Sequence, residues 1–174
     1  FIVSNHHIRA AAYAAVKNDT NITLMDNVSL EQMELEDYVT KLQLSNGQAI
    51  HAKLAAAADS RFSETRRKAG ISASMHDFGK TMIVCQMAHD KSHEGVAHEC
   101  FHHGHTLAVL PLNGNRSSVI ITLTPAEAER MMKISALEMN SWVAEQFQYR
   151  LGNMRLDSER FAYPLVGVYA DRFV

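Results

Sequence analysis

One short polar segment combines residue types and a spacing that suit ligand binding. Asp59, Ser63 and Arg66 follow the alanine run at residues 55–58. The Asp59 carboxylate can accept hydrogen bonds from ligand hydroxyls, and Ser63 can donate one. Arg66 can donate two parallel hydrogen bonds to a carboxylate or a phosphate. The same residues also fit a simpler arrangement, in which Asp59 caps a helix and the arginines form a surface cluster. Residue chemistry alone leaves both interpretations open.

The histidines are numerous, but their spacing does not form a metal-binding pattern. Seven of the ten lie between His76 and His105. His98 and Cys100 would face the same side of a strand, yet no H-E-x-x-H sequence or Cys/His knuckle accompanies them. We therefore expect no metal site, and we expect residues 102–105 to form a polar turn.

Nothing in the sequence indicates catalysis by the chain's own side chains. There is no G-x-S-x-G sequence, and no Cys or Ser has an obvious neighbouring base. Met131, Met132 and Met139 have helical spacing, which favours core packing over a ligand pocket. We therefore expect no catalytic residue.

Composition excludes several further classes of protein. The 174 residues are 47% hydrophobic and 21% charged, which is typical of a globular chain. The net charge of −2 gives no electrostatic reason to expect nucleic-acid binding. The eight glycines are scattered, so neither a G-x-G-x-x-G nor a G-x-x-x-x-G-K-[ST] phosphate-binding loop is present. No apolar run approaches the length of a membrane span, and the two cysteines lack a C-x-x-C arrangement, which favours reduced thiols.

The first third of the chain predicts a helix followed by a three-stranded meander. Residues 8–17 are rich in alanine and favour a helix, with Asn5 as its N-cap. Residues 22–25 predict a short strand. Strands at 28–33, 39–44 and 49–57 would form the meander, with Asn46-Gly47 as the last hairpin turn. The third strand would lead directly into the polar segment that begins at Asp59. A domain boundary is expected near residues 67–71.

The rest of the chain predicts an antiparallel sheet and two helices. Strands are expected at 78–88, 96–101, 106–112, 117–123 and 161–169. Thr124, Pro125 and Glu127 form a strong helix start, with a capping box and proline at the first helical position. A second helix would be capped at Asn140-Ser141 and end at Gly152. The expected fold class is α+β, a largely antiparallel sheet backed by helices and preceded by a β-meander.

The segment from Ala58 to Arg66 resembles the A-D-G-x-x-S-x-x-R motif of the flavin-dependent aromatic hydroxylases related to para-hydroxybenzoate hydroxylase. Asp59, Ser63 and Arg66 match the motif, and Ser60 stands where the family has glycine. Residues 99–112 are similar to the E-x-F … G … lAlLPl stretch of the ubiquinone-biosynthesis hydroxylases. Further similar stretches extend the resemblance over nearly the whole chain, at residues 3–13, 44–54, 117–123 and 163–165.

The resemblance implies a middle fragment of a longer flavoprotein. Residues 1–68 would be the C-terminal part of the FAD-binding domain, with its helix, β-meander and Asp motif. Residues 69–174 would be the substrate-binding domain of the para-hydroxybenzoate hydroxylase fold. The family's G-x-G-x-x-G would precede residue 1 and its G-D-A-x-H would follow residue 174. We therefore expect the fragment alone neither to hold FAD nor to hydroxylate.

The resemblance also implies roles for individual residues. The implied cofactor-binding residues are Asp59, Ser60, Ser63, Arg66, Asn5 and Arg9. Arg66 would in addition steady the loop that carries the motif. Pro164 and Leu165 would lie in the sheet beside the substrate pocket.

The implied activity is hydroxylation of a prenylated phenol ring in ubiquinone biosynthesis. NAD(P)H would reduce FAD, and O₂ would then form a C4a-hydroperoxyflavin that transfers an OH group to the ring. The flavin carries this chemistry, which agrees with the lack of a catalytic side-chain pair.

One alternative is a non-catalytic module of the same fold that binds a ligand or a partner. Its main support is Ser60, because glycine permits backbone geometries that serine disfavours. Another alternative is a hydroxylase of a soluble aromatic acid.

The expected partner is a prenylated phenol or quinone precursor, and no nucleic acid is expected. The expected location is the cytoplasm. Peripheral contact with the inner face of a bacterial membrane, contact with other ubiquinone-biosynthesis proteins, and a homo-oligomer stay open as further expectations.

Overall fold

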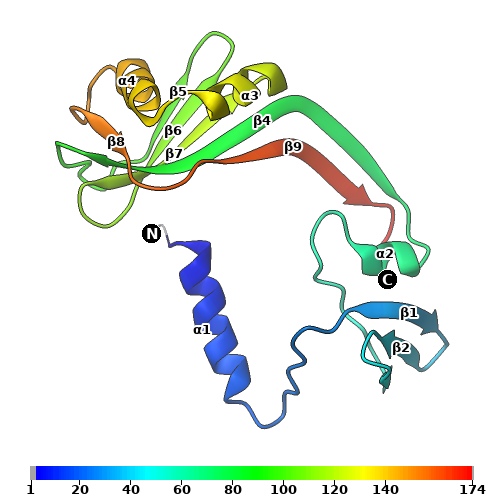
Figure 1. Ribbon diagram of the computed structural model, residues 1–174. Helices are drawn as coiled ribbons and strands as arrows, with labels where there is room; N and C mark the ends of the chain where they lie inside the picture. Colours follow the sequence, from blue (N-terminus) through cyan, green and yellow to red (C-terminus); the bar gives the residue numbers. More distant parts are fainter. Residues whose placement is uncertain (1–2, 174) are drawn as a thin grey trace. The chain divides into compact units, whose positions relative to one another are not determined.

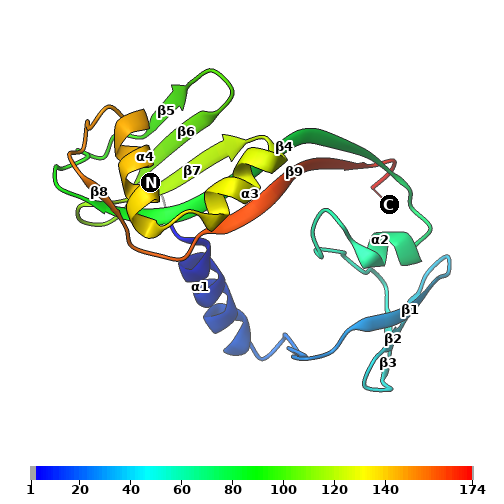
Figure 2. The ribbon, with the colours of Figure 1, turned by 45° about the horizontal axis from the view of Figure 1, so that its top comes forward.

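The computed structural model describes residues 3–173, which form two compact units (Figures 1 and 2). Residues 8–76 and 166–173 form the first, here called the meander unit. Residues 3–7 and 77–165 form the second, here called the sheet–helix unit. The chain therefore passes from one unit to the other at three points, within helix α1 (Asn5–Lys17) and within its two longest strands, β4 (Ala73–His89) and β9 (Phe161–Ala170).

The first part of the chain contains the predicted helix and the predicted meander. Helix α1 spans Asn5–Lys17. Strands β1 (Leu30–Leu35), β2 (Thr40–Leu44) and β3 (Ala49–Ala52) pair antiparallel in that order. Gly47 has a φ of 82° in the turn between β2 and β3, a conformation that glycine adopts without steric cost. A short helix α2 (Glu64–Lys68) follows the alanine run.

Three local predictions in this part are wrong. Helix α1 begins at Asn5 itself, so Asn5 is not the residue before the helix. Residues 22–25 form no strand, and Ile22 and Leu24 are 47% and 43% exposed, so no sheet buries them. Strand β3 ends at Ala52 rather than residue 57. Alanine lacks the branched side chains that pack well on a sheet, so the alanine run after Ala52 joins no ladder.

The sheet–helix unit is an antiparallel sheet with two helices on one face (Figure 2). Strands β5 (His98–Phe101), β6 (Thr106–Pro111), β7 (Arg116–Leu123), β4 and β8 (Met154–Leu156) lie in that order, and β9 pairs with β4. Helices α3 (Pro125–Lys133) and α4 (Ala136–Gln146) cover the sheet. The α+β fold class is confirmed.

The core lies between the sheet and these two helices. Every second residue of β7, from Ser117 to Leu123, is buried, because alternate side chains of a strand face the same layer. Met131 and Met139 pack into this core from α3 and α4, and Met132 lies against it, as their spacing predicts. The largest fully buried side chain is Phe147, which follows α4 directly.

The helix starts were predicted with mixed success. Thr124 and Glu127 form the expected capping box of α3. The predicted boundaries of the second helix are wrong, because α4 begins after Ser135 and ends at Gln146. Ser135 and Glu138 form a capping box of their own, and this earlier signal starts the helix. Asn140 lies within α4 instead, where its side-chain oxygen accepts a hydrogen bond of 2.7 Å from the Leu156 backbone N–H.

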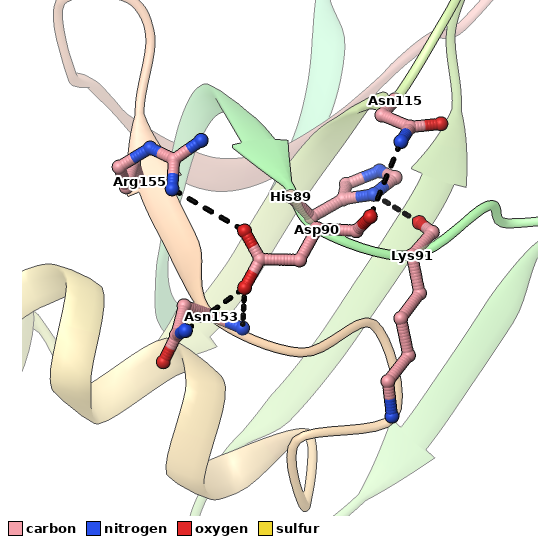
Figure 3. Close-up of polar contacts among 6 residues, drawn as sticks. All are labelled: His89, Asp90, Lys91, Asn115, Asn153 and Arg155. Atoms are coloured by element: carbon pink, nitrogen blue, oxygen red, sulfur yellow. Dashed lines mark hydrogen bonds and ion pairs between the residues drawn. The ribbon is translucent and has the colours of Figure 1, made fainter.

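A polar cluster fixes the turn between α4 and β8 to the end of β4 (Figure 3). The Asp90 carboxylate accepts hydrogen bonds from the backbone and side chain of Asn153, at 3.0 and 2.8 Å. It also pairs with Arg155 at 3.3 Å. The Asn153 backbone N–H is the largest cause that lowers the pKa of Asp90. The buried His89 ring bonds the Lys91 carbonyl and the Ser117 hydroxyl, at 2.7 and 3.0 Å. The Asp90 carboxylate and the His89 ring therefore both have their hydrogen-bond partners within the fold.

No helix among the described residues is long and apolar enough to cross a membrane.

Candidate functional site

A cavity of the meander unit lies around the polar segment that the sequence singles out. Its volume is about 450 Å³. Its apolar wall includes Met33 and Leu35 of β1, Ile71, and part of the alanine run. Its polar lining residues are Asp59, Ser60, Arg61, Ser63, Thr65, Arg66 and Arg172. One carboxylate and three arginines therefore face a partly apolar cavity, a combination that suits an anionic ligand with hydroxyl groups.

Asp59 is anchored to the first turn of α2. Its Oδ2 atom accepts a hydrogen bond of 2.9 Å from the Thr65 backbone N–H. The Ser63 hydroxyl and the Thr65 N–H hold the pKa of the Asp59 carboxyl well below its usual range, and the Ser63 hydrogen bond is the larger cause. Asp59 is therefore an oriented carboxylate at neutral pH.

Ser63, and not Asp59, is the N-cap of α2. The Ser63 side-chain oxygen accepts a hydrogen bond of 2.9 Å from the Arg66 backbone N–H. Ser63 is only 7% exposed, whereas Asp59 and Ser60 are exposed to the cavity side of the loop. The simpler arrangement considered for this segment is therefore replaced by one in which Ser63 caps the helix and Asp59 is held beside it.

Ser60 adopts a backbone conformation that usually requires glycine. Its φ is 75°, in the left-handed region. Its carbonyl accepts a hydrogen bond of 3.1 Å from the Ser63 N–H, which closes the turn into α2. The loop thus has a glycine-like geometry although serine occupies the position.

Arg66 holds the loop that follows α2. Its Nη1 atom donates a hydrogen bond of 2.6 Å to the Ile71 carbonyl, and the Ile71 N–H donates one of 3.1 Å to the Arg66 carbonyl. The Arg66 Nε atom is buried at the cavity and has no hydrogen-bond partner among the described residues. One buried donor of this side chain therefore has no partner within the described part of the chain.

The structure brings together only part of the predicted site. Asp59, Ser60, Ser63 and Arg66 all line the cavity. Arg9 lies on the exposed surface of α1 and does not line it. The remaining predicted residues belong to the sheet–helix unit: Asn5 at the start of α1, the exposed Pro164 of β9, and the half-buried Leu165 beside it.

Sequence analysis missed several cavity residues. Arg172 and Phe173 lie about one hundred positions beyond the motif, so no local pattern connects them to Asp59. Met33 and Leu35 carry a weak signal, since residues two apart on a strand share one face. The role of Thr65 comes from its backbone N–H, which no residue type reveals.

The histidine-rich region forms a turn with stacked rings. His102 and His105 lie between β5 and β6 with ring centroids 4.6 Å apart. Within residues 3–173, no group of three or more His, Cys, Asp or Glu side chains is placed to hold a metal ion.

Comparison with known proteins gives relatives along the whole chain, although no family model matches it. The chain is 41% identical over 173 residues to the ubiquinone hydroxylase UbiM of Neisseria meningitidis, covering 99% of this chain and 38% of that protein. It is 30% identical to the ubiquinone hydroxylase UbiL of Rhodospirillum rubrum, covering 100% of this chain and 41% of that protein. It is 24% identical to the 3-demethoxyubiquinol 3-hydroxylase of Escherichia coli, covering 100% and 44%. The chain thus spans about two fifths of the length of these curated relatives.

Solved structures show the same fold. The p-nitrophenol 4-monooxygenase PnpA of Pseudomonas putida matches with a TM-score of 0.72 at 17% identity, over 97% of this chain and 44% of that chain. The flavin-dependent monooxygenase PieE, solved with FAD and substrate, matches with a TM-score of 0.75 at 12% identity, over 99% and 32%. The resemblance inferred from the Asp59 segment is confirmed. The chain has the fold of the FAD-dependent monooxygenases and is homologous, over its whole length, to a segment of the ubiquinone hydroxylases.

Proposed function

We propose that the chain is a segment of an FAD-dependent monooxygenase that hydroxylates a prenylated phenol ring in ubiquinone biosynthesis, with NAD(P)H and O₂ as co-substrates. The observation that carries this proposal is the 41% identity to the ubiquinone hydroxylase UbiM over 99% of the chain. The names of the other relatives, UbiL and the 3-demethoxyubiquinol 3-hydroxylase, favour the same substrate class over a soluble aromatic acid.

The residues around the cavity fit part of an FAD molecule. FAD carries a pyrophosphate, which arginines can pair with, and ribityl hydroxyls, which a fixed carboxylate can bind. The cavity offers the anchored Asp59 carboxylate, three arginines, and the unpaired Nε donor of Arg66. In our proposal Asp59, Ser60, Ser63 and Arg66 hold the cofactor.

The chain's own contribution is to bind and to orient. When bound, FAD supplies the redox chemistry, which is the activation of O₂ for transfer of one oxygen atom to the phenol ring. The Asp59 carboxylate keeps a fixed direction because Ser63 and Thr65 bond it. Arg66 fixes the following loop through Ile71, and the apolar side chains of Met33 and Leu35 line one wall of the cavity.

Four finer assignments belong to the same proposal. Asn5 and Arg9 would approach FAD from α1, and Pro164 and Leu165 would lie beside the substrate. Residues 1–68 would be the end of the FAD-binding domain and residues 69–174 the substrate-binding domain. A prenylated substrate would place the enzyme in the cytoplasm, at the inner face of a bacterial membrane.

The alternative of a non-catalytic module of this fold has lost its main support. That support was the expectation that serine would disturb the loop at position 60. Ser60 instead has a φ of 75°, and the loop places Asp59, Ser63 and Arg66 around one cavity. The replacement of glycine therefore gives no structural reason to deny the loop a cofactor.

The test uses the full-length protein, stripped of flavin and reconstituted with FAD. We expect stoichiometric flavin uptake, and NADH or NADPH oxidation that a prenylated phenol accelerates. The Asp59→Ala variant is expected to bind FAD more weakly, whereas Asp37→Ala, which changes an exposed carboxylate outside the cavity, is expected to bind it normally. Absence of flavin uptake by the unaltered protein would refute the proposed function.

A further inference from the structure

Two asparagines of the chain are followed directly by glycine, Asn46 before Gly47 and Asn113 before Gly114. Such a pair can react with itself, because glycine has no Cβ and its backbone nitrogen can approach the preceding side chain closely. Once that nitrogen has lost its proton, it can attack the side-chain amide carbon of the asparagine. Both asparagines are exposed in hairpin turns, so exposure does not distinguish the two pairs.

The first pair is held by the turn between β2 and β3. The Gly47 N–H donates a hydrogen bond of 2.9 Å to the Leu44 carbonyl. The Asn46 side chain is fixed at both of its polar atoms: Oδ1 accepts the Gln48 backbone N–H at 3.1 Å, and Nδ2 donates to the Gln48 side-chain oxygen at 2.8 Å. An attack would have to break the first bond and turn the side chain out of the other two. The fold therefore opposes the reaction at Asn46.

The second pair, in the turn between β6 and β7, lacks such contacts. Within residues 3–173, neither the Asn113 side chain nor the Gly114 N–H has a hydrogen-bond partner. A Cβ added to Gly114 would meet no atom within 4 Å, so the space beside its nitrogen is open. The fold therefore leaves both reacting groups free.

An arginine also favours loss of the proton from the Gly114 nitrogen. Arg116 Nε donates a hydrogen bond of 3.4 Å to the Asn113 carbonyl, which belongs to the same peptide group as that nitrogen. When the nitrogen is deprotonated, its negative charge spreads onto this carbonyl oxygen. A cation bonded to the charged form of a group favours that form.

We propose that Asn113 is a site of spontaneous deamidation and that its turn protects Asn46 from the same reaction. Hydroxide removes the Gly114 amide proton, and the nitrogen forms a bond to the Asn113 side-chain carbon. The bond from that carbon to Nδ2 breaks, and the leaving nitrogen takes a proton from water and departs as ammonia. Water then opens the cyclic imide at one of its two carbonyls, which leaves aspartate or isoaspartate. Nothing is oxidised or reduced, and the inference does not depend on the proposed function.

The product should loosen this end of the sheet. Arg116 Nη1 pairs with Asp157 Oδ2 at 3.6 Å, and a new carboxylate at position 113 would compete for the guanidinium. Isoaspartate would in addition lengthen the backbone by one carbon, in a turn that the Leu112 N–H closes with a bond of 2.9 Å to the Arg116 carbonyl. We therefore expect the modified protein to melt at a lower temperature.

The test follows both pairs in one sample of the full-length protein. The protein is incubated at mildly alkaline pH and digested at intervals, and mass spectrometry measures the fraction of each pair in which the amide has become a carboxylate. A second sample is incubated in urea, where the turns are lost and the sequence alone sets the rates. The matched variants are Asn113→Gln and Asn46→Gln, because the longer glutamine side chain closes the ring much less readily.

In the folded protein we expect Asn113 to react about tenfold or more faster than Asn46, because attack at Asn46 must give up more than one hydrogen bond. In urea the two rates should approach each other. Incubation should lower the melting temperature of the unaltered protein and of Asn46→Gln, but not that of Asn113→Gln. Equal rates in the folded protein, or a rate ratio that urea does not change, would overturn the inference. An equal fall in the melting temperature of Asn113→Gln would overturn the expected effect on the turn.

Discussion

Replacing Ser63 by alanine should damage α2 and the Asp59 carboxylate together. The Ser63 oxygen caps α2 through the Arg66 N–H at 2.9 Å, and loss of such a cap costs about 0.5–2 kcal/mol. Ser63 is only 7% exposed, so water replaces the lost partner poorly and the upper half of that range, about 1–2 kcal/mol, is expected. Backbone amides of α2 should then exchange with solvent about 5- to 30-fold faster.

The same variant should change the titration of Asp59. The Ser63 hydrogen bond is the largest cause of the lowered pKa, so the pKa of Asp59 should rise toward its ordinary value of 3.8 in Ser63→Ala. A carboxyl whose pKa is lower in the folded than in the unfolded state stabilises the fold above the unfolded pKa. That stabilisation is lost as the pH falls below 3.8 toward the folded pKa. The stability gap between the unaltered protein and Ser63→Ala should therefore narrow in this acid range.

The assay is a carbon-13 titration of the Asp59 carboxyl by NMR, combined with amide hydrogen exchange. Ser135→Ala is the matched control, because Ser135 caps α4 in the same way but lies in the sheet–helix unit. It should lose cap energy from the lower part of the same range, because Ser135 is exposed to water, and it should leave the Asp59 titration unchanged. An Asp59 pKa that is the same in Ser63→Ala and in the unaltered protein would refute the reasoning.

Two further predictions concern the sheet–helix unit. Arg160 donates hydrogen bonds of 3.0 and 2.9 Å to carbonyls at the end of α3, so Arg160→Met should lower the free energy of unfolding by about 1–2 kcal/mol in urea titrations. The control is Arg130→Met, which changes an exposed arginine of α3 and should lower the free energy of unfolding by less than about 0.5 kcal/mol. Gly152 has a φ of 75°, and an added Cβ would lie 3.0 Å from the Asp90 Cβ, so Gly152→Ala should lower the melting temperature. Gly114→Ala, with a φ of 68° but open space around it, should lower it less; equal losses would contradict the predicted contact with Asp90.

The sequence predicts elements well wherever a local signal is complete. The capping box of Thr124 and Glu127 and the Asn46-Gly47 turn act within a few residues, and both are found. The start of α4 was misplaced because two local signals competed, Ser135 with Glu138 and the later Asn140-Ser141 pair. Strand β8 was not predicted, since its three residues are held by pairing with β4 rather than by any pattern of their own.

The candidate site divides in the same way. Asp59, Ser63 and Arg66 lie close together in the sequence, so a shared site was one of the two interpretations that their chemistry left open, and the family resemblance favoured it. Arg172 reaches the cavity only through the fold, and sequence spacing contains no information about that contact. The positive φ of Ser60 also depends on the turn into α2, and it could not be predicted from the residue type, because serine disfavours this conformation.

The most direct test of the proposed function is the source of oxygen in the product. The full-length protein, loaded with FAD, is given NADH or NADPH, a prenylated phenol and ¹⁸O₂, and the product is examined by mass spectrometry. We predict a hydroxylated ring that contains one ¹⁸O atom per turnover. Oxidation of the reduced nicotinamide without any ¹⁸O in the ring, or no oxidation at all in a protein that has taken up FAD, would contradict the account.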